Sequence, residues 1–126
     1  MGNRATGTLG ARAEQAAFRF LRNRDLRPVA RNFRSRGGEI DLIMLDAGCL
    51  VFVEVRSRRS SAFADPALTV DRIKQRKIVR TAALFVASNR RFSNHVMRFD
   101  VVAIEGGGAS SIRWIRDAFR PDDAAF

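Results

Sequence analysis

The segment VFVEVRSR, residues 51–58, places a carboxylate where a buried strand would normally carry an apolar side chain. Its valines are typical of a strand, but Glu54 and Arg56 interrupt the apolar run. A second acid, Asp41, lies in the preceding apolar segment EIDLIML, residues 39–45. Two carboxylates on neighbouring strands repel each other unless a positive group lies between them. Mg²⁺ is such a group, because it binds through one or two carboxylates together with water and phosphate oxygens.

The short turn DAGC decides whether these two acids meet. If it pairs Asp46 with Cys49, the register places Asp41 directly across from Glu54. Successive residues of the earlier strand should face opposite sides of the sheet. We therefore expect one face to carry Glu39, Asp41 and Ile43, and the other to carry Ile40, Leu42 and Met44. A slip of one residue would abolish the convergence. The alternative is that Glu54 forms an ordinary ion pair with a nearby arginine at an exposed sheet face.

The elements that must position these acids follow from the spacing of the apolar residues. Helical spacing predicts helices over residues 9–24 and 70–88, the second with Thr69 as its N-cap. Alternating and apolar runs predict strands at 29–34, 39–45, 50–58, 97–104 and 111–117. The order is helix-strand-strand-strand-helix-strand-strand, which predicts an α/β fold with one mixed sheet flanked by helices. We expect one domain over residues 1–126 with short flexible termini.

The charge of the chain favours a polyanionic partner. Lysine and arginine number 23 against 13 acids, for a formal net charge of +10. Because 21 of the 23 are arginine, genome composition alone is an alternative cause. We predict that a basic set contacts DNA phosphates, which positions DNA without reading its sequence. Its members are Arg31, Arg34, Arg58, Arg59, Arg72, Lys74, Gln75, Arg76, Lys77 and Arg80.

Two members of this set lie near the inward side of the second helix. Lys74 and Gln75 could contact a phosphate or water in the active site, or make ordinary hydrogen bonds between helix and sheet. On a later strand, Arg98 and Asp100 share one face, and we interpret them as a structural ion pair. Trp114 lies on neither a stacking platform nor a repeat, so packing is its expected role.

Several kinds of protein are disfavoured by the sequence. No apolar run approaches the roughly eighteen residues of a membrane span, and no secretory signal segment precedes the first helix, so we expect a cytoplasmic protein without a membrane partner. A single cysteine, Cys49, forms no internal disulfide. The chain contains neither a phosphate-binding P-loop nor a cysteine and histidine metal cluster.

Six segments together resemble the YraN-type family of small bacterial proteins, which is described as uncharacterised and endonuclease-like: GARAEQAAFRFL, VARNFR, GGEIDLI, VFVEVRSR, RFDVVAI and IRDAF. The resemblance covers nearly the whole chain. It implies a relation to the Holliday-junction resolvases of the PD-(D/E)xK superfamily, with their restriction endonuclease-like sheet flanked by helices. It also implies that Asp41 is a metal-binding acid, Glu54 the second acid, and Glu14 the acid that related resolvases place on their first helix.

The function implied by this resemblance is hydrolysis of phosphodiester bonds in DNA, dependent on Mg²⁺ or Mn²⁺. Branched or distorted DNA is the expected substrate, and a homodimer is expected if two strands are cut, as by the resolvases. We assign Asp41 and Glu54 to the metal, Arg56 to stabilisation of negative charge on the phosphate, and Glu14 to a contact through water. Glu39, expected opposite Arg56, is interpreted as an orienting partner.

One position departs from the superfamily pattern. Arg56 stands where the superfamily has a lysine, and arginine cannot act as a base because its guanidinium stays charged. The alternative function is therefore a non-catalytic nucleic-acid-binding module that retains the nuclease fold.

Overall fold

The computed structural model describes residues 7–58, 70–105 and 111–121. Two long helices, α1 and α2, and five strands make up this part of the chain, together with one short 3₁₀ helix. Their bounds are α1 Gly7–Arg22, β1 Arg27–Ser35, β2 Gly38–Asp46, β3 Cys49–Arg58, α2 Arg72–Ser88, η2 Arg90–Phe92, β4 Val96–Glu105 and β5 Ile112–Phe119. The predicted order of helices and strands is confirmed.

The strands form one mixed sheet in the order β1-β2-β3-β4-β5. The first three strands run antiparallel as a meander, β3 and β4 are parallel, and β5 is antiparallel to β4. A parallel pair requires a crossover connection, and the segment that contains α2 makes it. The predicted α/β class with a mixed sheet is therefore confirmed.

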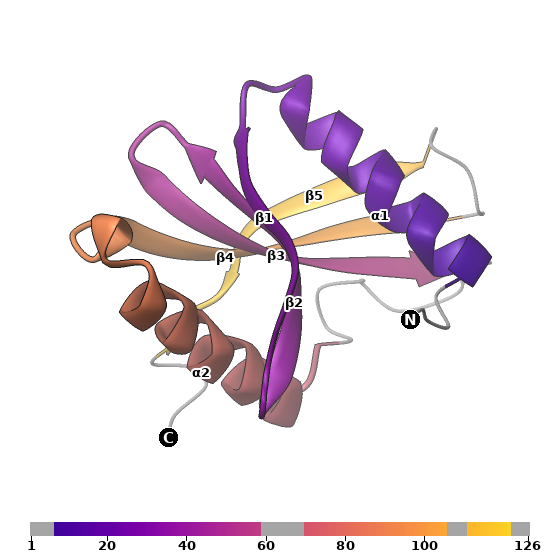
Figure 1. Ribbon diagram of the computed structural model, residues 1–126. Coiled ribbons are helices and arrows are strands. Elements are labelled where there is room, and N and C mark those ends of the chain that lie inside the picture. The colour runs from indigo at the N-terminus through magenta and orange to yellow at the C-terminus, as the bar shows by residue number, and fades with distance from the viewer. Residues whose placement is uncertain (1–6, 59–69, 106–110, 122–126) are drawn as a thin grey trace.

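The helices cover opposite faces of the sheet, as Figure 1 shows. Ala13, Ala17 and Leu21 recur every four residues on α1, and they pack with Leu42 and Val53 of the sheet. A second cluster lies on the other face, where α2 packs against the strands; it includes Ile43, Phe52, Ile78, Val79, Ala82, Phe85 and Phe99. Because both faces are covered, the central strands β3 and β4 are almost continuously apolar.

The start of α2 differs from the prediction. Asp71 is the N-cap, and its carboxylate accepts the backbone N–H of Lys74 at 2.8 Å. The proposed cap Thr69 is therefore wrong, and it lies outside the described residues. Aspartate is favoured at this place because its side chain satisfies one of the unpaired amides of the first helical turn. The polar loop that contains Ser60, Ser61 and Pro66 also lies outside the described residues.

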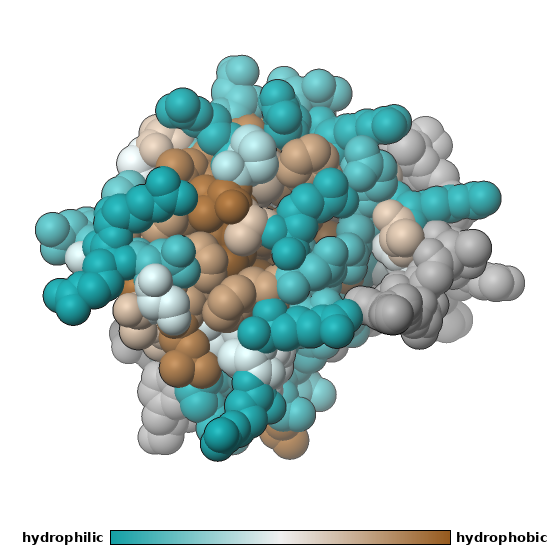
Figure 2. Space-filling model, viewed as in Figure 1, coloured by the Kyte–Doolittle hydropathy of each residue, from teal (hydrophilic) through white to brown (hydrophobic). Residues whose placement is uncertain are grey.

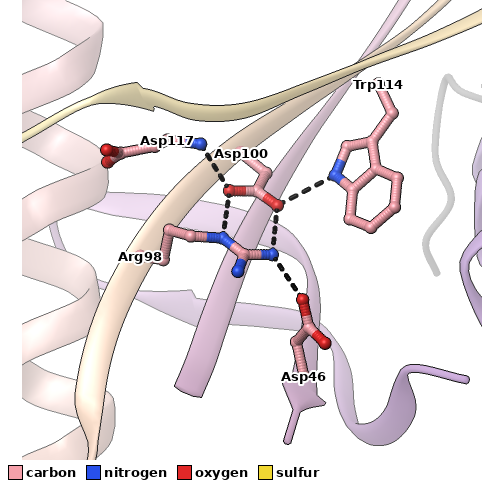
Figure 3. Close-up of polar contacts among 5 residues, drawn as sticks. All are labelled: Asp46, Arg98, Asp100, Trp114 and Asp117. Atoms are coloured by element: carbon pink, nitrogen blue, oxygen red, sulfur yellow. Dashed lines mark hydrogen bonds and ion pairs between the residues drawn. The ribbon is translucent and has the colours of Figure 1, made fainter.

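The buried carboxylate of Asp100 joins three strands at the β2–β3 hairpin end of the sheet (Figure 3). It accepts two hydrogen bonds of 2.9 Å from the Arg98 guanidinium and one of 2.9 Å from the Trp114 indole. The backbone N–H of Asp117 donates a fourth, also at 2.9 Å. Arg98 bonds Asp46 of β2 at 3.0 Å as well. The hydrogen bond to Asp100 is the main reason that the pKa of Arg98 is raised.

These contacts confirm the predicted ion pair between Arg98 and Asp100. Trp114 packs edge-on against Phe20 of α1 with ring centroids 6.2 Å apart, so its predicted packing role is confirmed, and the bond to Asp100 is added to it. No helix in the described part of the chain has both the length and the apolar character needed to cross a bilayer.

Candidate functional site

Asp41 lies where β2 and β3 stop pairing. The paired residues run from Asp46 and Cys49 at the turn to Leu42 and Val53, so the predicted turn register is confirmed. One residue further, a side chain makes the contact between the strands: the Oδ2 of Asp41 accepts a hydrogen bond from the backbone N–H of Val55 at 2.8 Å. The carboxylate therefore occupies the place of a ladder acceptor between the two strands.

The alternation of β2 breaks at Asp41. Ile40 packs in the cluster beneath α2, whereas Leu42 packs in the cluster beneath α1. The expectation that Ile40 shares a face with Leu42 is therefore wrong. Since successive strand residues normally face opposite sides, Ile40 and Leu42 should have lain together, and the backbone rotates between them instead. This rotation accompanies the hydrogen bond from Val55 to the Asp41 carboxylate.

Glu54 is almost fully buried, with 7% of the residue exposed. It projects from β3 on the α2 side, beside Phe52 of the same face. Its Oε2 lies 3.3 Å from the Nη1 of Arg56 and 3.3 Å from the Nζ of Lys74 in the first turn of α2. The two cations compensate a carboxylate that would otherwise be costly to bury.

Three other acids act on the pKa of Asp41. Burial first, then the charge of Glu54, and then the charges of Glu14 and Glu39 raise this pKa to about 8. The Val55 N–H opposes these effects. Glu14 comes from α1 and Glu54 from β3, so charges from two other elements act on Asp41 of β2.

Glu39 makes one contact that sequence reasoning did not predict. Its carboxylate lies 3.7 Å from the guanidinium of Arg34, which faces it across the β1–β2 ladder. Arg56 pairs with Glu54 on its own strand. The charge of Glu39 also raises the pKa of Asp41, and the expected position of Glu39 opposite Arg56 stays a prediction.

The donor set fits a hard divalent cation in one respect. Carboxylate oxygens are the ligands that Mg²⁺ prefers, and a buried aspartate with a raised pKa is a place where positive charge would be favourable. Among the described residues, however, no three histidine, cysteine, aspartate or glutamate side chains form a ready-made metal cluster. A cation here would depend on two carboxylates, with water and phosphate oxygens completing its shell.

The structure places the predicted DNA-contacting side chains on two elements. Arg72, Lys77 and Arg80 are exposed on α2, where Arg76 is half-buried; Arg31 and Arg34 are exposed on β1. Arg58 ends β3, and its side chain and the whole of Arg59 lie outside the described residues. Gln75 donates a hydrogen bond of 2.8 Å to the carbonyl of Val70, so it holds the segment that leads into α2.

The contact between Lys74 and Glu54 is the feature that sequence reasoning did not find. The helical pattern predicted only that Lys74 could turn towards the sheet, and it named no partner. The signal available was its position in the first turn of the crossover helix. The structure brings that turn next to β3, whereas in the sequence Lys74 and Glu54 are 20 positions apart.

Comparison with known proteins gives a family. The model of the uncharacterised protein family UPF0102 matches residues 13–104, a range that includes all the acids of the site. A UPF0102 protein of Saccharophagus degradans is 49% identical over 110 residues, which cover 87% of this chain and 91% of that protein. A UPF0102 protein of Ectopseudomonas mendocina is 46% identical over 111 residues, covering 88% of this chain and 93% of the relative. The names of these relatives state no activity.

Proposed function

This chain belongs to the uncharacterised protein family UPF0102, and on that premise we propose that it is a metal-dependent endonuclease that hydrolyses phosphodiester bonds in DNA. The observation that carries the proposal is the gathering of acids around Asp41, whose pKa rises to about 8. Two cationic side chains, Arg56 and Lys74, lie beside the same acids. Carboxylates for a divalent cation next to cations for a phosphate are the parts that phosphodiester hydrolysis requires.

Asp41 and Glu54 would hold Mg²⁺ or Mn²⁺. When bound, the cation would lower the pKa of a water molecule and polarise the phosphate. The hydrogen bond from Val55 fixes one oxygen of Asp41 in direction, which prepares the carboxylate for a ligand. Glu14 of α1, whose charge acts on Asp41, would orient water through its carboxylate.

Lys74 could supply the lysine that is missing at position 56. The superfamily that the sequence resembles uses a lysine two residues after the second acid, and this chain has Arg56 there. Lys74 presents its ammonium group to the same carboxylate from α2, at 3.3 Å. We assign to Lys74 the part of that lysine, and to Arg56 the stabilisation of the negative charge that develops on the phosphate.

The substrate in this proposal is branched or distorted DNA, contacted through its phosphates. The exposed basic side chains of α2 and β1 support it, because phosphate contacts position a duplex without selecting a sequence. A homodimer would be needed for coordinated cutting of two strands, since this proposal assigns one metal-binding centre to each chain.

Cleavage of labelled duplex, single-stranded, flap and four-way-junction DNA tests the proposal. With Mg²⁺ or Mn²⁺, the wild type should cut, and Asp41→Asn or Glu54→Gln should abolish cutting. Lys74→Ala should lower the rate roughly a hundredfold, as removal of one charge-stabilising donor does elsewhere. Asp117→Asn, which changes an exposed acid of β5 outside the site, is the matched control and should keep full activity. Retained cutting in Asp41→Asn or Glu54→Gln would refute the assignment.

One observation favours the second candidate, a non-catalytic nucleic-acid-binding module. The charge of Glu54 is already met by Arg56 and Lys74, as in a structural ion-pair network. This candidate predicts that every variant binds DNA and none cuts it. It also predicts that Glu54→Gln changes the free energy of unfolding without any effect on a cleavage product.

A further inference from the structure

Five arginines cluster where α1 ends and β1 begins, and none of them forms an ion pair with a carboxylate of the described residues. All five are exposed: Arg19, Arg22, Arg24, Arg27 and Arg31. Other arginines of the described residues do form ion pairs, among them Arg98 with Asp100 and Arg34 with Glu39. An uncompensated group of this size creates a positive potential that attracts anions.

Aromatic rings hold two of these guanidinium groups in place. The Cζ of Arg31 lies 4.4 Å from the centre of the Phe18 ring, and its Nη2 donates to Gln15 at 3.1 Å. The Cζ of Arg24 lies 3.6 Å from the centre of the Phe20 ring, and its Nη1 donates to the Phe20 carbonyl at 3.2 Å. Stacking orders the guanidinium and leaves N–H groups at its edge for a phosphate.

The surface between these side chains is hollowed. One hollow of about 330 Å³ is lined by Gln15, Phe18, Arg19, Arg22 and Asn23. A second, of about 580 Å³, is lined by Arg22, Asp25, Leu26, Arg27 and Pro28, so the two meet at Arg22. Asp25 is the single carboxylate that lines either of them. We call the two together the α1–β1 groove.

The α1–β1 groove is connected to the acidic centre through neighbouring residues. Gln15, which bonds Arg31, is the neighbour of Glu14 in α1, and Arg31 pairs on the ladder with Leu42, the neighbour of Asp41. Figure 2 shows hydrophilic side chains projecting over the region of α1 and β1. The basic helix α2 covers the opposite face of the sheet, so positive charge flanks the centre from both sides (Figure 1).

We propose that the α1–β1 groove is a second phosphate-binding surface, which holds the backbone of one arm of a DNA substrate while α2 holds another. The proposal deepens the proposed function and rests on its DNA substrate. Guanidinium groups ordered by stacking and free of carboxylate partners are suited to bidentate phosphate contacts. Two basic faces separated by a sheet fit a molecule with two duplex arms better than they fit one straight duplex.

A binding experiment tests the groove. Fluorescence anisotropy, without divalent cations, measures the affinity of the full chain for a labelled four-way junction and for a labelled straight duplex. We expect the Arg19→Gln, Arg22→Gln, Arg31→Gln variant to lose at least tenfold in affinity for the junction and much less for the duplex. The charge-matched control is Arg90→Gln, Arg91→Gln, Arg120→Gln, which removes three exposed arginines elsewhere. It should change either affinity less than threefold.

A second variant keeps the test decisive if the loss of Arg31 stacking lowers stability. Arg19→Gln, Arg22→Gln alters only exposed helical positions, and it should still weaken junction binding relative to the control. Equal affinities of the groove variants and the control would overturn the inference. Absence of junction binding by the wild type would overturn both the groove and the proposed DNA substrate. Binding that depends on the groove, without cutting in Mg²⁺, would refute the endonuclease alone.

Discussion

Asp41 is half-buried and has acidic neighbours, so its ionised form is unfavourable in the folded protein. Its pKa is raised to about 8 from an ordinary value of 3.8, first by burial and then by Glu54. In the folded protein the carboxyl therefore keeps a proton that the unfolded chain releases above about pH 4. Stability linked to this group is greatest at low pH and declines as the pH rises towards 8.

Replacing Asp41 by asparagine should remove that dependence. The carboxamide oxygen can still accept the Val55 N–H, while the charge is lost. With a chelator present, we expect Asp41→Asn to be more stable than the wild type at pH 8, and the difference to shrink towards zero at pH 4. The slope linked to one proton is at most about 1.4 kcal/mol per pH unit. Urea unfolding between pH 4 and pH 8 measures the free energy.

The matched control is Asp25→Asn, which changes an exposed aspartate outside the acidic centre. Its stability should follow the wild type across the whole range. If the free energy of unfolding of Asp41→Asn also follows that of the wild type across this pH range, ionisation of Asp41 does not destabilise the folded protein, and the interpretation is wrong.

The strands β2, β4 and β5 are tied together by the polar network around Asp100 (Figure 3). Asp100→Asn replaces one accepting oxygen with a donor that faces other donors. It also leaves Arg98, which is largely buried, without its main counter-charge. We expect a loss of about 3 kcal/mol in the free energy of unfolding, since breaking one side of a buried pair is costly.

Asp117→Asn serves as the comparison because it lies on the same network but donates only its backbone N–H. Its side chain pairs with the exposed Arg120, and that contact is worth less than about 1 kcal/mol. Denaturant unfolding of both variants measures the difference. Equal losses for the two would mean that the buried carboxylate of Asp100 does not hold the strands together.

The arrangement of helices and strands was predictable because each element carries its own local signal. The apolar run of β3 and the DAGC turn define a hairpin, and its register places Asp41 and Glu54 directly after the last paired residues, where the charge of Glu54 raises the pKa of Asp41. The N-cap was missed by two residues because Thr69 and Asp71 are both good capping residues, and only the path of the chain decides between them. The local sequence pattern therefore predicted which helices and strands form more accurately than it predicted where they begin and end.

The rest of the site depends on contacts between distant parts of the chain. Lys74 reaches Glu54 because the crossover seats the first turn of α2 beside β3, and nothing in either segment encodes that approach. The rotation of β2 between Ile40 and Leu42 departs from strand alternation, which is the rule used to read the sequence. The acid pair was thus accessible to sequence reasoning, while its cationic partner from α2 was not.

The charge of the whole molecule is distributed rather than concentrated. The chain has a net charge of +10, and exposed basic side chains lie on α2, on β1 and at the end of α1, on both sides of one sheet. The acidic centre lies between these surfaces. Long-range attraction would bring a nucleic acid to either face, and the acids would repel its phosphates at the centre unless a cation were present.

Salt dependence is the property of the whole molecule that this distribution predicts. If six side chains of α2 and β1 each contact a phosphate, log affinity should fall against log salt with a slope of about −5, at 0.9 for each contact. The six are Arg31, Arg34, Arg72, Arg76, Lys77 and Arg80. The base sequence of the DNA should have little effect on the affinity, because phosphate contacts carry no sequence information. Titrations of two unrelated duplexes at several salt concentrations measure both quantities.

The variant Arg72→Gln, Lys77→Gln, Arg80→Gln should make this slope shallower by about 3, since three phosphate contacts are lost. The control with Arg90, Arg91 and Arg120 changed to glutamine removes the same charge and should leave the slope near that of the wild type. This comparison separates contact from net charge, because both variants lower the charge of the chain equally. A slope that changes equally in both would mean that the net charge of the chain, and not the face of α2, governs its attraction to DNA.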